Sequence, residues 1–362
     1  MKENQQKNGA QANTLVSLIT VNWNGLEYLK MLFSSLRKVS YQPIEVILVD
    51  NASSDESVTF TREHFPEVKI VQNDKNYMYA RGNNEGIKVA RGEILCLINN
   101  DVKVDPGFLE PVVQTFLSDE EVVACQPKIL DLQLPEQFEY AGAAGGFIDR
   151  YGYPFLRGRL FFTVEEDRGQ YDADINLFWA SGACLFLRRN ALGQVGLLDE
   201  DFILHMEEID LCWRIHLAGK LIRYVSESLV WHKGGGTMSA DDPRKVYWNY
   251  RNNIFLLVKN LSGVNLIKVV CARFFLDFLA FAGEIARGKL RSAISILKAY
   301  IWVLLHVPLL FRKRRLVQRQ RIAGDRQVFR FIYPGSIVWE YFVRGRKKFS
   351  DLKRKGFLGV NI

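Results

Sequence analysis

Cysteine is scarce in this sequence, and its spacing matches no common metal or disulfide pattern. The chain of 362 residues has five cysteines that lie far apart, and no two of them form a CxxC pair. A disulfide framework and a zinc site are therefore disfavoured, and a reducing, cytoplasmic compartment is expected. Residues 1–14 are polar and lack the apolar core of a signal peptide, which predicts a disordered leader.

Several motifs of common enzyme classes are missing as well. No GxGxxG follows the first apolar run and no GxxxxGK(S/T) occurs, so a Rossmann-type dinucleotide site is disfavoured and a P-loop is excluded. The motifs GxSxG and HExxH are also absent. The hydrophobic fraction of 48% is ordinary for a globular protein and too high for a disordered chain.

The net charge of +8 is an average over two unlike parts of the chain. Residues 1–258 contain 26 Lys and Arg against 35 Asp and Glu, whereas residues 259–362 contain 22 against 5. The first part therefore carries −9 and the second +17. This asymmetry predicts an enzyme-like domain over 15–258 and a basic region over 259–362 with a different task.

Short apolar runs alternate with helical patterns in the acidic part. The runs at 16–23, 45–55, 68–73 and 93–101 each end in polar residues, and helical patterns lie between them. This alternation predicts an α/β fold with a mostly parallel sheet and helices on both faces. Ligands of such sheets bind outside the carboxyl ends of the strands, so the polar clusters would share one site. The alternative is that these residues only form turns and helix caps.

Two groups of residues downstream carry carboxylates suited to chemistry. Asp101 follows the fourth apolar run and can supply a carboxylate to Mg²⁺ or Mn²⁺ bound with substrate phosphates, although a lone Asp also suits a turn. Glu207 and Glu208 fall in the first turn of a helix predicted over 206–218. They can act as a general base, or simply complement the helix dipole.

Two further side chains are candidates for ligand contact. His232 follows an apolar run and precedes three glycines, which suits either a ligand or a structural histidine. Arg251 precedes an apolar helix and can form a two-pronged contact with a diphosphate, or lie on the surface with its stem packed on apolar neighbours.

Taken in order, seven motifs resemble one known family. They are VNWNG (21–25), VDNASSD (49–55), NYMYARGNNEGI (76–87), LINNDV (97–102), ASGACLFLRRNAL (180–192), GLLDEDFILHMEEIDLCWR (196–214), and WHKGGGTMS followed by YWNYRN. The pattern resembles the inverting family-2 nucleotide-sugar glycosyltransferases of GT-A fold, and within them the bacterial rhamnosyltransferase-like branch.

The resemblance implies roles for the matching positions. Asp50 would contact the nucleotide base, and Glu208 would be the general base with Glu207 as its rival. Asp101 and His232 would hold a divalent cation, Mn²⁺ or Mg²⁺. The remaining donor-binding positions would be Asn22, Asn24, Asn84, Asn100 and Arg251.

Two departures from the family pattern affect this reading. The metal motif reads Asn99-Asn100-Asp101, with one carboxylate instead of two, which leaves metal dependence open. The base position holds Glu208 where Asp is usual. The resemblance implies transfer of a sugar, with rhamnose first, from a nucleoside-diphosphate sugar to a cell-surface glycan or polyprenyl-diphosphate-linked acceptor. A UDP-hexose or UDP-galactofuranose donor, or a catalytically silent nucleotide-sugar-binding scaffold subunit, are the alternatives.

The basic region contains two apolar stretches. The stretch 266–283 carries three charged residues, which disfavours a membrane-spanning helix, and 293–311 has basic residues on both sides, so its orientation is undefined. We expect both to lie on an anionic membrane surface, which would place the protein peripherally at the inner face of the cell membrane. A spanning helix, a helical packing region and a homo-oligomer contact are alternatives. Nucleic acid is not expected, because stacking aromatics do not interleave the basic residues.

Overall fold

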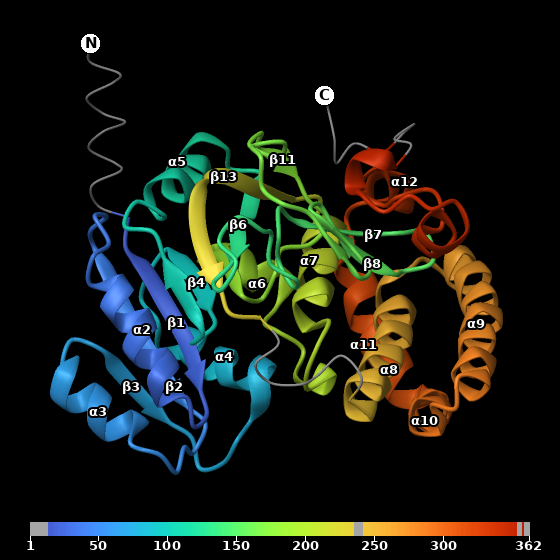
Figure 1. Cartoon of the computed structure of the whole chain (residues 1–362), viewed down its shortest axis with the longest axis horizontal. Coiled ribbons are helices and arrows are strands. Elements are labelled where there is room, and N and C mark those ends of the chain that lie inside the picture. The colour runs from blue at the N-terminus through green and yellow to red at the C-terminus, as the bar shows by residue number, and fades with distance from the viewer. Residues whose placement is uncertain (1–13, 235–241, 353–356, 358–362) are drawn as a thin grey trace.

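A computed structural model describes residues 14–234, 242–352 and 357 (Figure 1). Most of the predicted leader, and the last two of the three glycines after His232, lie outside the described residues. The first half alternates strand and helix as expected. Its elements are β1 (Val16–Asn22), α2 (Leu26–Leu36), β2 (Ile44–Asp50), α3 (Ser57–His64), β3 (Lys69–Gln72), α4 (Met78–Val89), β4 (Ile94–Ile98), β5 (Val102–Val104), α5 (Glu110–Ser118) and β6 (Val122–Asp131).

The second half begins with short strands and ends in helices. The strands are β7 (Gly146–Ile148), β8 (Pro154–Leu156), β9 (Arg159–Leu160), β10 (Thr163–Val164), β11 (Ile175–Asn176), β12 (Cys184–Arg188) and β13 (Leu221–His232). The α-helices are α6 (Leu192–Val195), α7 (Glu207–Leu217), α8 (Pro243–Asn260), α9 (Gly263–Ala286), α10 (Leu290–Leu305), α11 (Val307–Gln320) and α12 (Asp325–Val328). Five single turns complete the described elements: Arg189–Ala191, Glu200–Phe202, Phe329–Phe331, Trp339–Val343 and Phe349–Asp351.

The predicted mostly parallel sheet is confirmed. Its main path runs β11-β13-β6-β12-β4-β1-β2-β3, and β5 pairs with β13. The pairs β1–β2, β1–β4, β2–β3 and β6–β13 are parallel, whereas β12 runs antiparallel between β4 and β6. A separate small antiparallel sheet joins β7, β8, β9 and β10. The central strands are apolar on both faces because helices cover both, as the fully buried pattern of β4 illustrates.

The basic C-terminal region packs into the same core as the sheet. Leu310, Val317 and Phe349 belong to one buried cluster with Leu97 of β4 and Trp213 of α7. Backbone bonds reinforce this packing, because the residues that follow α11 donate to the carbonyl of Leu217. The expected boundary between residues 258 and 259 falls inside α8. The C-terminal helices therefore complete the core on one side of the sheet (Figure 1).

No described helix alone has the length and hydropathy to cross a membrane. Helices α10 and α11 meet that test only as a pair, and they are bent by 70° at the break between them.

Helix α4 lies unusually close to the sheet. A Cβ added at Gly86 would lie 2.3 Å from Cγ2 of Ile19 in β1 and 3.0 Å from Cγ2 of Val49 in β2. Glycine is therefore required here by close approach, and not by its backbone angles.

We expect Gly86→Ala to lower the free energy of unfolding by about 1–3 kcal/mol through overpacking, although Ala favours a helix by about 1 kcal/mol. Urea denaturation measures this change. Gly193→Ala in α6 is the control, since no atom lies within 4 Å of its added Cβ. Equal stability of the two variants would contradict the close-packing argument.

Candidate active site

The polar ends of the parallel strands meet at one edge of the sheet, as the sequence predicted. Asn22 at the end of β1 is in register with Asp50 at the end of β2, which in turn pairs with Gln72 of β3. After β4, the side chain of Asn100 donates to Asn22 Oδ1 at 2.7 Å. Segments that are distant in sequence therefore build one polar surface.

A turn after β1 and a turn after β2 are tied together at this edge. Asn24, with a φ of 51°, accepts a hydrogen bond from the amide of Ser54 at 2.7 Å through Oδ1. Asp50 Oδ2 accepts from the amide of Ser53 at 3.0 Å. Its buried Oδ1 has no hydrogen-bond partner in the part of the chain that the structure describes. A free, buried carboxylate oxygen is suited to accept a hydrogen bond from a ligand, and its contact with a nucleotide base stays a prediction.

His232 lies between two carboxylates. Its Nε2 is 3.0 Å from Asp101 Oδ1, and its Nδ1 is 3.4 Å from Glu139 Oε1. Burial acts to lower the pKa of His232, but the two carboxylates outweigh it and raise that pKa to about 10. Burial acts to raise the pKa of Asp101, and the hydrogen bond from His232 lowers it below the ordinary value. The structure thus brings together the two predicted metal ligands.

A divalent cation held by these two side chains would replace the bond between them. Asp101 Oδ1 and His232 Nε2 are 3.0 Å apart because they share a hydrogen bond, and a cation on both atoms would take the place of the shared proton. Among the described residues, no group of three or more His, Cys, Asp or Glu side chains is placed to hold a metal ion. The other positions would fall to donor phosphates and water, which is usual for Mg²⁺ in nucleotide enzymes.

Glu139 was missed by the sequence analysis. Its side chain is fully buried, with Oε1 3.4 Å from the Nδ1 of His232, and its charge helps to raise the pKa of that histidine. It lies in the connection between β6 and β7, away from every recognised motif. No local pattern marks it, because only the folding of this connection against the end of β13 brings it to His232.

Glu207 and Glu208 begin α7, as predicted. Glu207 is only 3% exposed, whereas Glu208 is half-buried. Burial raises the pKa of both, and repulsion from Glu208 raises that of Glu207 further. The pKa of Glu208 is raised to about 7, against the opposing effect of backbone N–H groups that stabilise its ionised form. Two adjacent carboxylates cannot easily ionise together, so Glu208 ionises first.

The segment before β12 connects the acid pair with the turn that carries Asp101. The amide of Asn99 donates to the carbonyl of Ala183 at 3.0 Å. The hydroxyl of Tyr79 donates to the carbonyl of Gly182 at 2.7 Å, and the charges of Glu208 and Glu207 add to the effect of burial in raising the pKa of this tyrosine. Residues 182–183 thus bond both to Asn99, in the turn that carries Asp101, and to Tyr79, whose pKa is raised by the charges of the acid pair.

The family model named glycosyl transferase family 2 matches residues 17–196, about half of the chain. The chain belongs to this family. It is a glycosyltransferase with a GT-A-like fold that uses a nucleotide-sugar donor. The matched range includes the polar edge from Asn22 to Asp101 and ends before α7, so the roles of Glu207, Glu208 and His232 stay predictions.

Individual relatives agree with this assignment. The enzyme is 25% identical over 268 residues to an N-acetylglucosaminyl-diphospho-decaprenol L-rhamnosyltransferase of Mycobacterium tuberculosis, covering 69% of this chain and 86% of the relative. It is 28% identical over 221 residues to an O-antigen biosynthesis protein, RfbC, of Myxococcus xanthus, covering 59% of this chain and 17% of that protein. The solved structure of GalNAc-T7 with UDP, GalNAc and Mn²⁺ shares the fold with a TM-score of 0.52 at 18% identity, over 67% of this chain and 47% of that one.

The loop that leads into α7 has a strained backbone. Ile203, His205 and Met206 have φ angles of 66°, 70° and 71°, although none of them is glycine. Such conformations cost of order 1–3 kcal/mol each and persist only where the surroundings enforce them. They place Glu207 and Glu208 directly at the end of a constrained loop.

Two neighbouring residues of α8 hold this loop. Asn252 is fully buried, and its Nδ2 donates to the carbonyls of Phe202, Leu204 and His205 at 3.0, 2.8 and 2.7 Å. Nη1 of Arg251 donates to the carbonyl of Asp201 at 2.5 Å, and its guanidinium lies 3.7 Å from the centroid of the Trp302 ring. The observed contacts of Arg251 are within the protein, and its predicted contact with donor phosphates stays a prediction.

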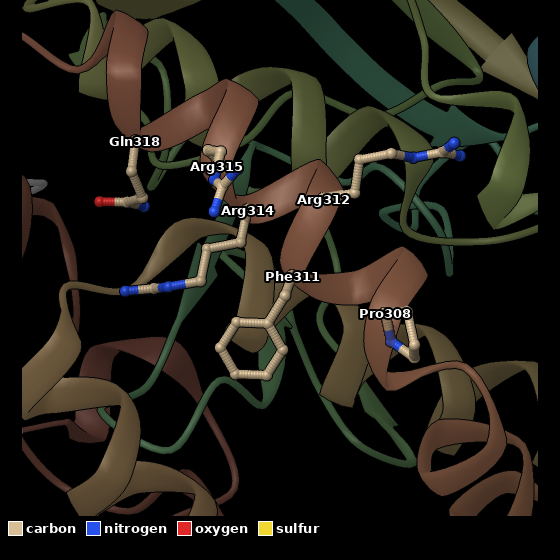
Figure 2. A pocket seen from close by; sticks show the side chains of 6 residues that line it. All are labelled: Pro308, Phe311, Arg312, Arg314, Arg315 and Gln318. Carbon is tan, nitrogen blue, oxygen red and sulfur yellow. The ribbon is translucent and has the colours of Figure 1, made fainter.

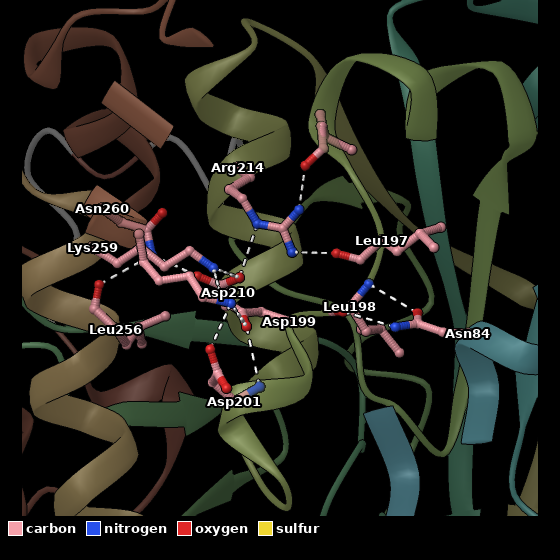
Figure 3. Close-up of polar contacts among 12 residues, drawn as sticks. Asn84, Leu197, Leu198, Asp199, Asp201, Asp210, Arg214, Leu256, Lys259 and Asn260 are labelled. Carbon is pink, nitrogen blue, oxygen red and sulfur yellow. Dashed lines mark hydrogen bonds and ion pairs between the residues drawn. The ribbon is translucent and has the colours of Figure 1, made fainter. Parts of the chain in front are cut away.

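Asn84 also makes its contacts within the protein (Figure 3). Its amide bonds the backbone of Leu198 through both Nδ2, at 2.9 Å, and Oδ1, at 3.2 Å, and donates to Glu200 Oε1 at 3.0 Å. It therefore anchors the segment before α7 to α4. Its predicted role in the donor pocket stays a prediction.

The raised pKa of Glu208 makes its charge unfavourable in the folded enzyme. The folded-state pKa of about 7 exceeds the ordinary 4.5, so this group lowers stability as pH rises from about 4.5 to 7.

We expect Glu208→Gln to raise the free energy of unfolding by about 1–2 kcal/mol near pH 8, a figure that allows for the partial exposure of Glu208. Near pH 4 the substitution should leave the free energy of unfolding unchanged. Urea denaturation at both pH values measures this. Glu63→Gln, on the exposed side of α3, is the control. An increase in the free energy of unfolding that is equal at both pH values would contradict the raised pKa of Glu208.

We expect Asn252→Ala to reduce kcat at least tenfold with little change in the KM for donor, because the released loop misplaces the acid pair. Three buried carbonyls would also lose a donor, which lowers stability by about 1–3 kcal/mol. Steady-state kinetics and urea denaturation separate the two effects. Ser228→Ala is the control, since Ser228 of β13 is equally buried but donates to the carbonyl of Phe108, away from the loop. Equal losses of kcat would mean that Asn252 has only a structural role.

Proposed function

We propose that the enzyme transfers a sugar, with inversion, from a nucleoside-diphosphate sugar to a hydroxyl of a lipid-linked glycan acceptor. The observation that carries this proposal is the acid pair at the start of α7, where Glu208 has a pKa of about 7. A general base works best with a pKa near the operating pH, because it is then both ionised and basic. Its partner Glu207 is buried more deeply and stays protonated to higher pH.

In the proposed reaction, Glu208 accepts the proton of the acceptor hydroxyl as that oxygen attacks the anomeric carbon. The bond from this carbon to the diphosphate oxygen breaks on the opposite face, so a single displacement inverts the configuration. The strained loop and Asn252 hold the base in position. The free Oδ1 of Asp50 would accept a hydrogen bond from the nucleotide.

A divalent cation, Mn²⁺ or Mg²⁺, would neutralise the charge that develops on the leaving diphosphate. Asp101 and His232 are the residues that would hold it, with Glu139 holding the histidine ring from its other side. Because the cation requires the nitrogen lone pair of His232, its binding must displace a proton and should strengthen as pH rises. The solved relative GalNAc-T7 contains Mn²⁺, which supports this class of cation.

Rhamnose is the first proposed sugar, with dTDP-rhamnose as donor. The support is the mycobacterial relative, whose name specifies L-rhamnose and an N-acetylglucosaminyl-diphospho-decaprenol acceptor. A polyprenyl-diphosphate-linked acceptor would place the enzyme in polysaccharide or cell-envelope synthesis, peripherally at the inner face of the cell membrane. UDP-hexose and UDP-galactofuranose are the competing donors.

We expect Glu208→Gln to keep donor binding near normal and to reduce kcat by two or more orders of magnitude, because only the base is removed. Thermal-shift measurements with dTDP-rhamnose and UDP-sugars, with and without Mn²⁺, identify the donor by its stabilisation of the protein. Radiolabel transfer to a lipid-linked acceptor then gives kcat.

Glu207→Gln is the matched control, with a smaller expected loss because Glu207 stays protonated. The reverse order of losses would make Glu207 the base. A wild-type protein that is stabilised by a donor but shows no turnover with either cation would instead be a silent nucleotide-sugar-binding subunit.

A further inference from the structure

Helix α9 buries charged side chains and exposes apolar ones. Of its 24 residues, only Arg273 and Asp277 are buried. Its exposed residues include large apolar side chains, with Phe274 at 63%, Phe275 at 61% and Leu279 at 51% exposure. A helix on a water-facing surface has the opposite arrangement. The outer face of α9, at one end of the molecule in Figure 1, is therefore suited to apolar surroundings.

The inward charges of α9 are fully engaged, which allows this inversion. Nη2 of Arg273 lies 3.1 Å from Asp277 Oδ2, and its Nη1 donates to the carbonyl of Tyr151 at 3.1 Å. The hydroxyls of Tyr153 and Tyr300 donate to Asp277 at 3.0 and 2.7 Å. The bonds to Tyr151, Tyr153 and Tyr300 fix the rotation of α9, so its apolar side cannot turn inward without breaking them and exposing the Arg273–Asp277 pair.

Helix α10 continues the apolar surface. It packs on α8 and α9, and Ala293, Ile296 and Ala299 are buried on its inner side. Its outer side exposes Leu290, Ile294, Leu297, Ile301, Leu304 and Leu305 at helical spacing. The two helices together expose thirteen large apolar side chains, whereas exposed apolar residues that occur singly are what is normal on protein surfaces.

Arginines border this surface where α10 bends into α11. A hollow of about 520 Å³ is lined by Arg312, Arg314 and Arg315 with Phe311, Pro308 and Gln318 (Figure 2). Arg291, in the first turn of α10, is a further exposed cation. Acidic residues hardly oppose them, because α9, α10 and α11 contain only Asp277, which is buried, and Glu284, which pairs with Arg287.

We propose that the outer faces of α9 and α10 dock the enzyme on an anionic lipid bilayer, with lipid phosphates held by the exposed Arg312 and Arg315 beside Phe311. Apolar side chains enter the headgroup and acyl boundary, while guanidinium groups form charge-assisted bonds to phosphate oxygens. The surface combines both features that interfacial binding requires, and neither α9 nor α10 alone has the length and hydropathy to cross a membrane.

Charge selects this occupant over two others. A second copy of the chain, related by a two-fold axis, would place this cationic surface against itself, which is electrostatically unfavourable. A nucleic acid would leave the phenylalanines and leucines of α9 and α10 exposed to water. An anionic bilayer satisfies the apolar and the cationic groups together.

This inference rests on the proposed function, because a lipid-linked acceptor requires the enzyme to work at a membrane. It deepens that function by assigning the surface that meets the lipid. Docking and sugar transfer are measured separately, so failure of one does not imply failure of the other.

The test is sedimentation of the full-length protein with vesicles of phosphatidylcholine alone or mixed with phosphatidylglycerol. The wild type is expected to bind the mixed vesicles and to dissociate at high salt. Phe275→Ser with Leu279→Ser should abolish binding to both kinds of vesicle. Arg312→Gln with Arg315→Gln should weaken binding to the mixed vesicles about 30-fold, since each basic residue near an anionic surface contributes about fivefold.

Matched controls keep the test specific. Leu117→Ser changes a leucine of α5 that is 40% exposed, and helix α5 lies on the side of the molecule away from α9 in Figure 1. Lys38→Gln with Arg62→Gln removes two cations elsewhere. Both controls should bind vesicles like the wild type, and all variants should retain the thermal stabilisation by donor.

Two results would overturn the docking surface. The first is a failure of the specific vesicle binding. Either the wild-type protein binds neither kind of vesicle, or the control variants lose as much binding as the test variants. The second is a dimer in analytical ultracentrifugation that Phe275→Ser with Leu279→Ser dissociates, which would make this face a contact between copies. Donor turnover that persists in either case would leave the proposed transferase function standing.

Discussion

A buried ion-pair network around Lys259 fixes the position of α7, on which the candidate site depends. Nζ of Lys259, in α8, lies 2.6 Å from Asp199 and 2.7 Å from Asp210 (Figure 3). Arg214 shares Asp210 at 2.9 Å, and Lys313 of α11 shares Asp199 at 2.6 Å. Because removal of one member would leave an unpaired charge in the core, the helices and the loop that contribute to the network are constrained together. The contacts of Asp210 and Arg214, one or two turns further along α7, therefore fix the position of Glu207 and Glu208.

The same network shows that the acidic and basic parts of the chain are joined by ion pairs. The basic C-terminal region is not simply attached to an acidic domain, since Lys313 neutralises Asp199 and Asp201, and Arg314 donates to the carbonyl of Val258. Part of the +17 is thus used to complete the fold. The cations that remain on the outer surface of α9, α10 and α11 lie beside apolar side chains, and this remainder carries the membrane proposal.

Unfavourable features of the fold are concentrated where catalysis is proposed. The loop before α7 has three non-glycine residues with positive φ, Glu207 has a buried oxygen without a partner among the described residues, and two carboxylates are adjacent. Each costs stability in the free enzyme. The compensation comes from Asn252 and the Lys259 network, whose bonds are satisfied. A substrate hydroxyl that bonds to the acid pair would relieve part of this cost.

The sequence by itself determined the alternation of strands and helices, the shared polar edge from Asn22 to Asp101, and the start of α7 at Glu207. These features follow from local periodicity and from the rule that parallel strands end on the same side. Tertiary structure alone decided that Glu139 meets His232, that Arg251 and Asn84 bond backbone groups of the protein, and that Arg273 and Asp277 of α9 point inward. In each of these cases the partner lies far away in the sequence. A pattern of residue types reports what a side chain can do, whereas packing decides which partner it finds.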